Sequence, residues 1–275
     1  MKKANNITAD KEQAKLSGRA RPVLKILLLS LFAVIVITLV FVAPRFSISE
    51  IDVGGYNFYT KNQIIEKSGL RVGQNGFAAL RGRNVLKALS FRCDAAETAV
   101  MSAYPYIKSV QITYIMPDKI RVDVEERIKS VIVPYFGSGL LIDGEGYVVD
   151  IVRSYRQSGL PVAEGMAVSR YEIGKMLPVD DDLKLDRLLS VVNALRQADR
   201  DSDETLAWMI ETIDVGDMRN TVLVTNRGVD VSLGDGTELY YRISVVKEIL
   251  AYGVEADERG SIIFTNNARP VFKKG

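Results

Sequence analysis

The chain of 275 residues contains no histidine and a single cysteine, Cys93. The absence of histidine excludes Ser–His and Cys–His catalytic pairs and every zinc site that uses a His ligand. A lone cysteine cannot form a disulfide within the chain. Cys93 falls in a stretch with a helical pattern, where we expect it to be a small core or half-buried residue rather than a reactive thiol. The sequence therefore lacks several of the side chains from which active sites are commonly built.

The net charge is also small, only +2, and it is unevenly distributed. Residues 1–25 hold seven Lys or Arg and two acidic residues, a net charge of +5, so the remainder of the chain carries −3. The positive charge thus belongs to the N-terminal tail and not to the folded part. We therefore expect no nucleic-acid binding.

A long apolar run follows the basic tail. Ile26–Ala43 contains no charged residue and consists mostly of Leu, Ile, Val and Phe. As a helix it would rise roughly 27 Å, close to the ~30 Å thickness of the hydrocarbon core of a membrane. Lys25 can snorkel to the interface, so we predict a transmembrane helix over residues 23–43. A buried core helix is disfavoured because the run is apolar on every face.

A cleaved signal peptide is the main alternative, since its apolar region spans about 7–15 residues and ends in a small-residue site. The run here is longer than that. Cleavage after Ala43 would also place the bulky Phe41 at the third position before the cleaved bond, where a small residue is needed. Basic residues are also more frequent before the span than after it, which predicts that the N-terminus stays in the cytoplasm. We therefore predict a cytoplasmic tail over residues 1–22, an uncleaved anchor, and an extracytoplasmic remainder.

The first part of that remainder has the pattern of a compact α/β module. Phe46–Gly54 alternates as a strand, and Thr60 with Gln63 forms a capping box at the start of a short helix. A longer helix is predicted over Asn84–Ala103. The apolar residues at helical spacing are expected to face inward: Val85, Leu86, Leu89, Ala96, Val100 and Met101. Two alternating strands follow, with a turn at Pro117-Asp118.

The second part mixes strands and helices. The expected elements are a strand at Ser130–Pro134, a hairpin at Leu140–Val149, a helix at Asp180–Ala198, three antiparallel strands within Met209–Leu233, an amphipathic segment at Leu239–Tyr252 and a last strand at Ser261–Thr265. The acidic turn at Asp143–Gly146 lacks the ligand spacing of an EF-hand, so a plain hairpin is favoured. The acidic triplet at residues 180–182 suits a helix N-terminus better than a catalytic cluster.

Together these patterns resemble a known family. Ile51-Asp-Val-Gly-Gly55, the Thr60 cap and Gly69-Leu70 resemble the start of a POTRA domain of the FtsQ/DivIB type. The more specific match is Pro105-Tyr-Ile107 followed by Val122-Asp-Val-Glu-Glu-Arg127. The later hairpin, the Leu160–Gly165 loop and the segments after Val231 are similar to the β domain of the same family.

The resemblance implies an α+β protein with a single N-terminal transmembrane helix, a β-α-α-β-β POTRA domain over residues 46–127 and a mixed β domain with antiparallel strands over residues 128–275. It also implies a scaffold of the bacterial division machinery that is not an enzyme and needs no cofactor or metal. The implied partners are bitopic coiled-coil division proteins, FtsB/DivIC-like and FtsL-like, and the septal peptidoglycan synthase complex.

In the family, a partner adds to the edge of the last strand of the β domain. The matching residues are Gly260, Ser261, Ile262, Ile263, Phe264, Thr265 and Asn266. Two alternatives remain open at this point. One is an accessory of protein translocation or insertion, because POTRA modules also serve there. The other is an extracytoplasmic wall hydrolase that uses acids alone, for which the available residues are Asp143, Glu145, Asp150, Asp235 and Glu238.

Overall fold

The computed structural model describes residues 22–39, 43–155, 158–200, 205–255, 258–264 and 269–275. The chain forms two compact units. The first contains residues 1–100 and 110–124, and the second contains residues 101–109 and 125–275. Residues 107–109 and 125–126, the two ends of the 107–126 hairpin, thus belong to the second unit. The sequence pattern placed the domain boundary after residue 127.

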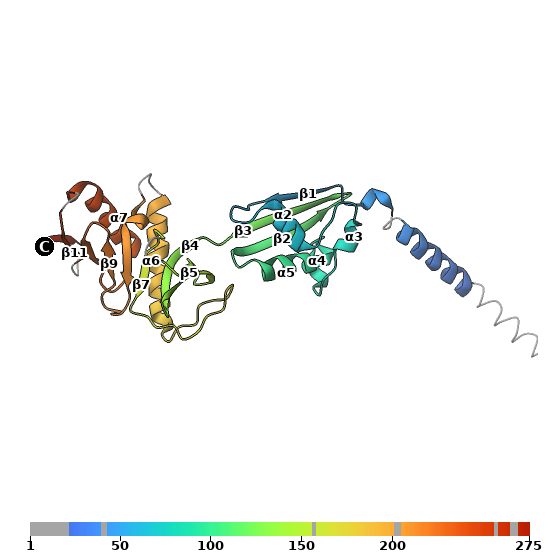
Figure 1. The fold of residues 1–275 in the computed structure, drawn as a ribbon. Helices are drawn as coiled ribbons and strands as arrows, with labels where there is room; N and C mark the ends of the chain where they lie inside the picture. The colour runs from blue at the N-terminus through green and yellow to red at the C-terminus, as the bar shows by residue number, and fades with distance from the viewer. Residues whose placement is uncertain (1–21, 40–42, 156–157, 201–204, 256–257, 265–268) are drawn as a thin grey trace, which may run out of the picture. The chain divides into compact units, whose positions relative to one another are not determined.

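An apolar helix spans Pro22–Leu39, near the N-terminus (Figure 1). Its mean hydropathy is 2.6 and none of it is buried within the protein. Ser30 and Thr38 are its hydroxyl residues, and each donates a hydrogen bond to a backbone carbonyl three or four residues earlier. Neither hydroxyl is therefore without a hydrogen-bond partner, which is compatible with a membrane-spanning segment. The predicted cytoplasmic tail lies outside the described residues, except for Pro22.

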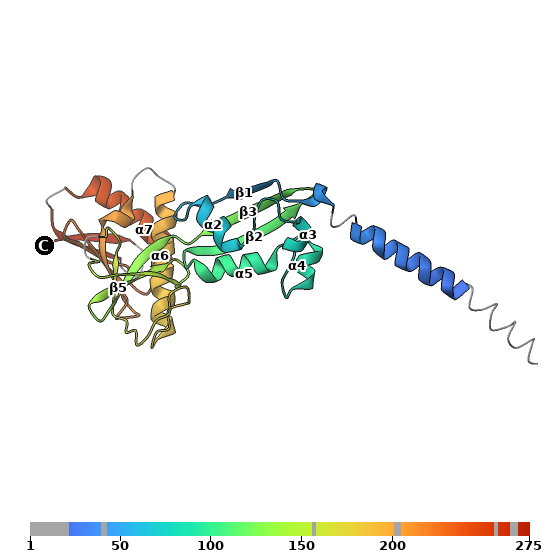
Figure 2. The ribbon, with the colours of Figure 1, turned by 45° about the vertical axis from the view of Figure 1, so that its right-hand side comes forward.

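The rest of the first unit is a three-stranded sheet with helices against it (Figure 2). Its elements are the 3-10 helix η1 (Pro44–Phe46), β1 (Glu50–Gly54), α2 (Lys61–Ser68), α3 (Gly76–Ala79), α4 (Val85–Leu89), α5 (Asp94–Ala103), β2 (Ile107–Ile115) and β3 (Lys119–Glu126). The strand order is β1-β3-β2, with β1 parallel to β3. Alternate residues of β1 and β3 are buried, so one face of this sheet packs on the helices and the other meets solvent.

Local sequence explains the start of α2. The Thr60 hydroxyl accepts a hydrogen bond from the Gln63 backbone, and the Gln63 side chain accepts one from the Thr60 backbone. This is the predicted capping box. The helix ends at Gly69, whose left-handed conformation (φ 69°) suits a residue without a Cβ.

The predicted helix over Asn84–Ala103 is wrong in one respect, because it is two helices. The chain breaks between α4 and α5, where Phe91 adopts a positive φ of 57°. Val85, Leu86 and Leu89, expected to face inward, are 71%, 75% and 73% exposed, and Met101 is 45% exposed. Ala96 and Val100 are buried, as expected. The physical reason lies on the opposite side of α4, where Lys87 pairs with the partly buried Asp94 and the buried Glu97.

The second unit is built on a nine-stranded sheet. Its strands are β4 (Lys129–Tyr135), β5 (Ser138–Asp143), β6 (Val148–Val152), β7 (Val162–Glu164), β8 (Ile210–Asp214), β9 (Val222–Thr225), β10 (Val229–Ser232), β11 (Gly260–Phe264) and β12 (Pro270–Lys274). Its helices are α6 (Asp182–Arg200), η2 (Leu206–Met209), α7 (Leu239–Glu248) and η3 (Ile249–Gly253), of which the last is a π-helix. The strand order is β12-β11-β10-β9-β8-β7-β4-β5-β6. The predicted hairpin and the three antiparallel strands are confirmed.

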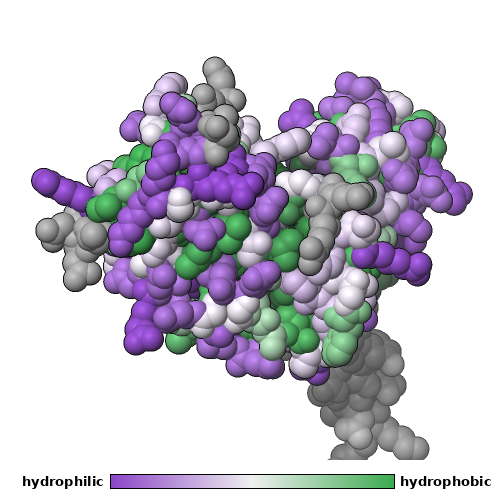
Figure 3. Space-filling view, turned by 60° about the vertical axis from the view of Figure 1, so that its left-hand side comes forward, coloured by the Kyte–Doolittle hydropathy of each residue, from purple (hydrophilic) through white to green (hydrophobic). Residues whose placement is uncertain are grey.

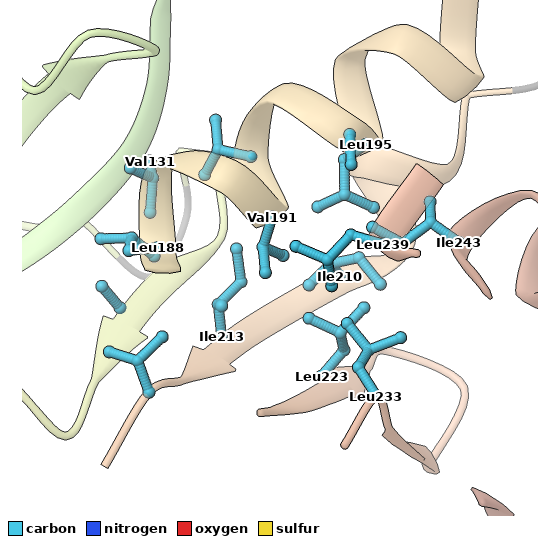
Figure 4. Close-up of a cluster of buried hydrophobic side chains, with 14 of the residues drawn as sticks. Val131, Leu188, Val191, Leu195, Ile210, Ile213, Leu223, Leu233, Leu239 and Ile243 are labelled. Carbon is cyan, nitrogen blue, oxygen red and sulfur yellow. The ribbon is translucent and has the colours of Figure 1, made fainter. Parts of the chain in front are cut away.

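The core of this unit lies between the sheet and the helices α6 and α7 (Figure 4). Leu188, Val191 and Leu195 of α6 point toward Ile213 and Leu223 of the strands, and all five are at most 2% exposed. The heptad-like spacing in α6 therefore serves packing on the sheet. Together the two units and the N-terminal helix form the expected α+β architecture.

Candidate partner-binding site

The outer strand β12 is the most exposed open edge of the second unit. It pairs antiparallel with β11, in the register Gly260 opposite Lys274 and Phe264 opposite Pro270. Among the residues that the structure describes, no strand pairs with its other side. An edge of this kind offers backbone groups to an incoming segment.

The register shows which backbone groups are open. The N–H of Gly275 donates to the carbonyl of Arg259, at 3.0 Å, so residue 275 bonds toward β11. In an antiparallel pair, residues that bond to the neighbour alternate with residues whose N–H and C=O point the other way. Phe272 and Lys274 therefore direct both backbone groups away from β11. Pro270 has the same phase but lacks an N–H.

Packing fixes β12 against β11. A Cβ at Gly260 would lie 2.3 Å from the carbonyl oxygen of Lys273 and 2.9 Å from the ring of Phe272, so glycine permits the close approach of the two strands. Phe272 is half-buried and packs on the core, whereas Val271 is 43% exposed. The edge strand thus has one side chain in the core and one apolar side chain at the surface.

The helix before β11 is held by a buried arginine. Arg242 of α7 donates hydrogen bonds to the carbonyl of Leu233 and to the hydroxyl of Thr237, the latter at 2.8 Å. Its guanidinium carbon lies 5.7 Å from the ring centre of Phe264. Hydrogen bonds from Thr237 hold the pKa of Asp235 below its ordinary value, with the charge of Arg242 contributing. These contacts tie the end of β10, the start of α7 and β11 together beneath the edge.

The opposite edge of the sheet is different. The segment after Gly174 runs along the start of β6, where the Val148 N–H donates to the Lys175 carbonyl and the Gly174 N–H donates to the Val148 carbonyl. The edge at β6 is thereby partly occupied by the chain itself. Figure 3 turns the second unit toward the viewer and shows hydrophobic residues in separate patches among hydrophilic ones.

The structure corrects the position of the predicted edge strand. Residues Gly260–Phe264 form β11, which lies between β10 and β12 and is therefore an interior strand. Ile262 and Phe264 face the core at 0% and 7% exposure, while Ser261 and Ile263 are half-buried. Thr265 and Asn266 lie outside the described residues.

Sequence reasoning missed β12 because the strand is short and its last two residues are lysines. The available signal was the proline at the start of Val271-Phe272, since proline is common at the first residue of an edge strand. Two apolar residues are too few to establish an alternating pattern.

The acidic residues considered for catalysis have structural roles. Asp143 is 3% exposed, pairs with Arg127 at 2.6 Å and accepts hydrogen bonds from the backbone of the hairpin turn. Its neighbour Glu145 pairs with Lys108 at 2.7 Å, which holds the pKa of Glu145 below its ordinary value.

Two of the remaining three acids also accept hydrogen bonds. Asp150 accepts hydrogen bonds from the Tyr106 hydroxyl and from the backbone of Ile151, and Asp235 accepts them from Thr237. Glu238 lies at the N-cap of α7. Within the described ranges, no group of three or more Cys, Asp or Glu side chains could hold a metal ion.

Comparison with known proteins supplies the family. The model of the FtsQ-type POTRA domain matches residues 46–127. Across 241 residues the chain is 24% identical to the cell division protein DivIB of Clostridium acetobutylicum, covering 86% of this chain and 87% of that protein. Residues 46–127 thus match an FtsQ-type POTRA domain, and the chain resembles FtsQ/DivIB proteins over most of its length.

Other family members match over similar lengths. DivIB of Clostridium botulinum is 21% identical over 98% of both chains. The cell division protein FtsQ of Corynebacterium glutamicum is 23% identical over 75% of this chain and 80% of its own length. FtsQ/DivIB proteins are generally scaffolds without enzymatic activity, and the N-terminal apolar helix is consistent with a membrane anchor.

Proposed function

We propose that the protein is a membrane-anchored scaffold of the bacterial divisome, and that its second unit binds another division protein by strand addition at β12. The observation that carries this proposal is the pair of open backbone positions at Phe272 and Lys274, on an edge strand fixed by its packing. Strand addition satisfies such groups through main-chain hydrogen bonds. Similarity to cell division proteins of the FtsQ/DivIB family supports the cellular role.

The proposed partners are bitopic division proteins of the FtsB/DivIC-like and FtsL-like kinds. A partner with its own single span shares the membrane with this chain, so the two proteins meet at a raised effective concentration. The complex would in turn hold septal peptidoglycan synthases at the division site. This function requires extracytoplasmic folded units, in agreement with the distribution of basic residues around the anchor.

The side chains at the edge favour an acidic partner segment. Lys273 and Lys274 are both exposed. Lys274 pairs with Glu258 at 3.2 Å, but its side chain is 77% exposed, so this pair contributes little to stability. A carboxylate on the partner could compete for either lysine, and complementary charge mainly raises the rate of association and the specificity.

The test compares two substitutions at one position. Lys274→Pro removes an outward N–H and places a ring on the edge, while the bonds to β11 keep their partners. Lys274→Ala removes the same side chain and the same ion pair but keeps the N–H. An unpaired buried partner group costs about 1–3 kcal/mol, so we expect Lys274→Pro to weaken binding by roughly 5- to 150-fold relative to Lys274→Ala.

The measurement is co-purification of the full-length variants with the division partners from detergent-solubilised membranes, followed by titration. The far-ultraviolet circular dichroism of the purified variants serves as the folding control. If both variants bind equally while the circular dichroism is unchanged, strand addition at β12 is refuted.

No observation favours the two alternatives. Four of the five acids available to a wall hydrolase form ion pairs or accept hydrogen bonds, and Glu238 lies at the N-cap position of α7 without a side-chain cap bond. For a translocation accessory, capture of secretory or barrel proteins in the same co-purification would be the distinguishing result.

A further inference from the structure

The helix α4 in the first unit has its charged and apolar sides reversed relative to an ordinary surface helix. None of its residues is buried. Its three large apolar side chains, Val85, Leu86 and Leu89, are each more than 70% exposed. Lys87, in contrast, turns toward the protein, where its ammonium lies 2.8 Å from both Asp94 and Glu97.

This orientation is enforced by contacts on the protein side of α4. Glu97 is 2% exposed and also accepts two hydrogen bonds from Arg92, at 2.8 and 2.9 Å. Asp94 accepts hydrogen bonds from the backbone of Arg83 and Asn84, just before the helix. Because these polar contacts hold α4, its apolar side chains cannot turn inward without breaking them.

The end of α4 is fixed to the sheet as well. Arg92 forms a bridge to Thr113 of β2. The Tyr114 N–H donates to the carbonyl of Phe91, and the Cys93 N–H donates to the carbonyl of Ile112, both at 2.8 Å. The exposed apolar face is therefore a feature of the folded unit and not of a loose segment.

The surrounding sequence has charge of one sign. Residues 69–93 contain five basic residues and no acidic residue: Arg71, Arg81, Arg83, Lys87 and Arg92. Arg71, Arg81 and Arg83 are exposed, and none of the three forms an ion pair with any residue that the structure describes. Val72, 66% exposed, adds a further apolar side chain. Exposed aliphatic residues beside unpaired arginines match the chemistry of an anionic membrane surface.

The chain also keeps this region close to the membrane. Only four residues separate Leu39, at the end of the apolar helix, from Pro44 at the start of η1, a reach of roughly 17 Å when fully extended. The ring of Phe46 packs on Phe77 of α3, with 5.2 Å between ring centres. Figures 1 and 2 both show α3 and α4 together at the end of the unit where η1 enters.

We propose that the apolar face of α4, with Arg81 and Arg83, docks on the anionic lipid surface of the membrane that holds the anchor. The three aliphatic side chains enter the interface and the guanidinium groups contact lipid phosphates. The contact would fix the first unit against the membrane in addition to the covalent tether. It does not depend on the proposed division partners, because it requires only lipid.

The test uses full-length protein reconstituted in lipid vesicles, with a spin label at Leu86→Cys. The native thiol does not interfere, because Cys93 is fully buried and burial raises its pKa to about 12. The matched control is a label at Leu183→Cys, a 66% exposed position on α6 of the second unit. Power saturation compares the access of oxygen, which partitions into lipid, with that of a water-soluble nickel chelate.

In vesicles of phosphatidylglycerol and phosphatidylcholine, we expect oxygen access to exceed nickel access at position 86 and the reverse at position 183. The double variant Arg81→Gln, Arg83→Gln should shift position 86 toward water, whereas Arg121→Gln, at an exposed position of β3, should not. Water access at position 86 in anionic vesicles overturns the proposal. So does a label that is protected only in native membranes, which would identify a protein as the occupant. Equal insertion in neutral and anionic vesicles would overturn the role given to the arginines.

Discussion

The buried carboxylate of Glu97 gives a prediction about the stability of the first unit. Its side chain accepts hydrogen bonds from Lys87, from two nitrogens of Arg92 and from the backbone N–H of Ile112, at 2.8 to 3.0 Å. Glu97→Gln keeps the shape and one acceptor for Ile112 but removes the negative charge. Lys87 and Arg92 are each about one-third exposed and can turn to water, so the loss is smaller than for a fully buried pair.

We therefore expect Glu97→Gln to destabilise the unit by about 2 kcal/mol, and Glu97→Ala, which also leaves the Ile112 N–H unpaired, by about 3 kcal/mol. The reporter is Cys93, which is 0% exposed and one helical turn before Glu97. Opening of the unit exposes this thiol, so its labelling rate in full-length protein measures the free energy of opening. A change of 2 kcal/mol corresponds to roughly 30-fold faster labelling.

Glu97→Gln should also change how the stability of the first unit depends on pH. Burial disfavours the charged form of Glu97, but the hydrogen bonds from Arg92, Lys87 and Ile112 outweigh it, so the pKa lies below the ordinary value of 4.5. A carboxylate with a lowered pKa stabilises the folded state above its unfolded pKa, and this contribution disappears as the pH falls through the folded pKa. Wild-type protein should thus lose stability below about pH 4.5, and Glu97→Gln should lose less over that range.

A disulfide reagent that reacts at acidic pH, such as dithiodipyridine, makes the comparison possible. The control is Glu66→Gln, at an exposed position of α2 in the same unit, which should label at the wild-type rate. If Glu97→Gln also labels at that rate, or if its stability falls with acid as steeply as that of wild type, the network does not stabilise the unit as argued.

Two further substitutions test local features. Thr60→Ala removes one half of the capping box and should destabilise the first unit by about 1 kcal/mol, seen as roughly fivefold faster labelling of Cys93; Thr60→Ser, which retains the hydroxyl, should restore most of it. Gly165→Ala should destabilise the second unit by about 2 kcal/mol or more, because φ is +83° and a Cβ would lie 2.2 Å from the backbone nitrogen of Gly216. Denaturant unfolding followed by far-ultraviolet circular dichroism measures this loss, and an unchanged midpoint would refute the steric argument.

Much of the fold could be predicted from local signals. The capping box at Thr60, the turn at Pro117-Asp118 and the hairpin at Asp143–Gly146 each depend on a few neighbouring residues. Alternation in β3 correctly indicated its buried face, because side chains of a strand point to opposite sides in turn. The family resemblance rested on the spacing of these same features.

The candidate site could be predicted less well. The segment Gly260–Phe264 is a strand, as expected, but its alternating burial is the same whether it lies at an edge or inside a sheet. The order of strands depends on which segments pair, and β11 pairs with β10 across an intervening helix. Because the short strand β12 pairs with β11, β12 and not β11 is the edge strand among the described residues.

The sequence by itself determined the apolar span, the asymmetry of charge around it, and the lack of histidine chemistry, because each depends only on which residues occur and in what order. Tertiary structure decided that β12 is the edge and that the apolar side of α4 faces outward. The spacing of Val85, Leu86 and Leu89 shows that they share a side of the helix. Only the partly buried carboxylate of Asp94 and the buried carboxylate of Glu97, which attract Lys87 from the other side, determine which way that side turns.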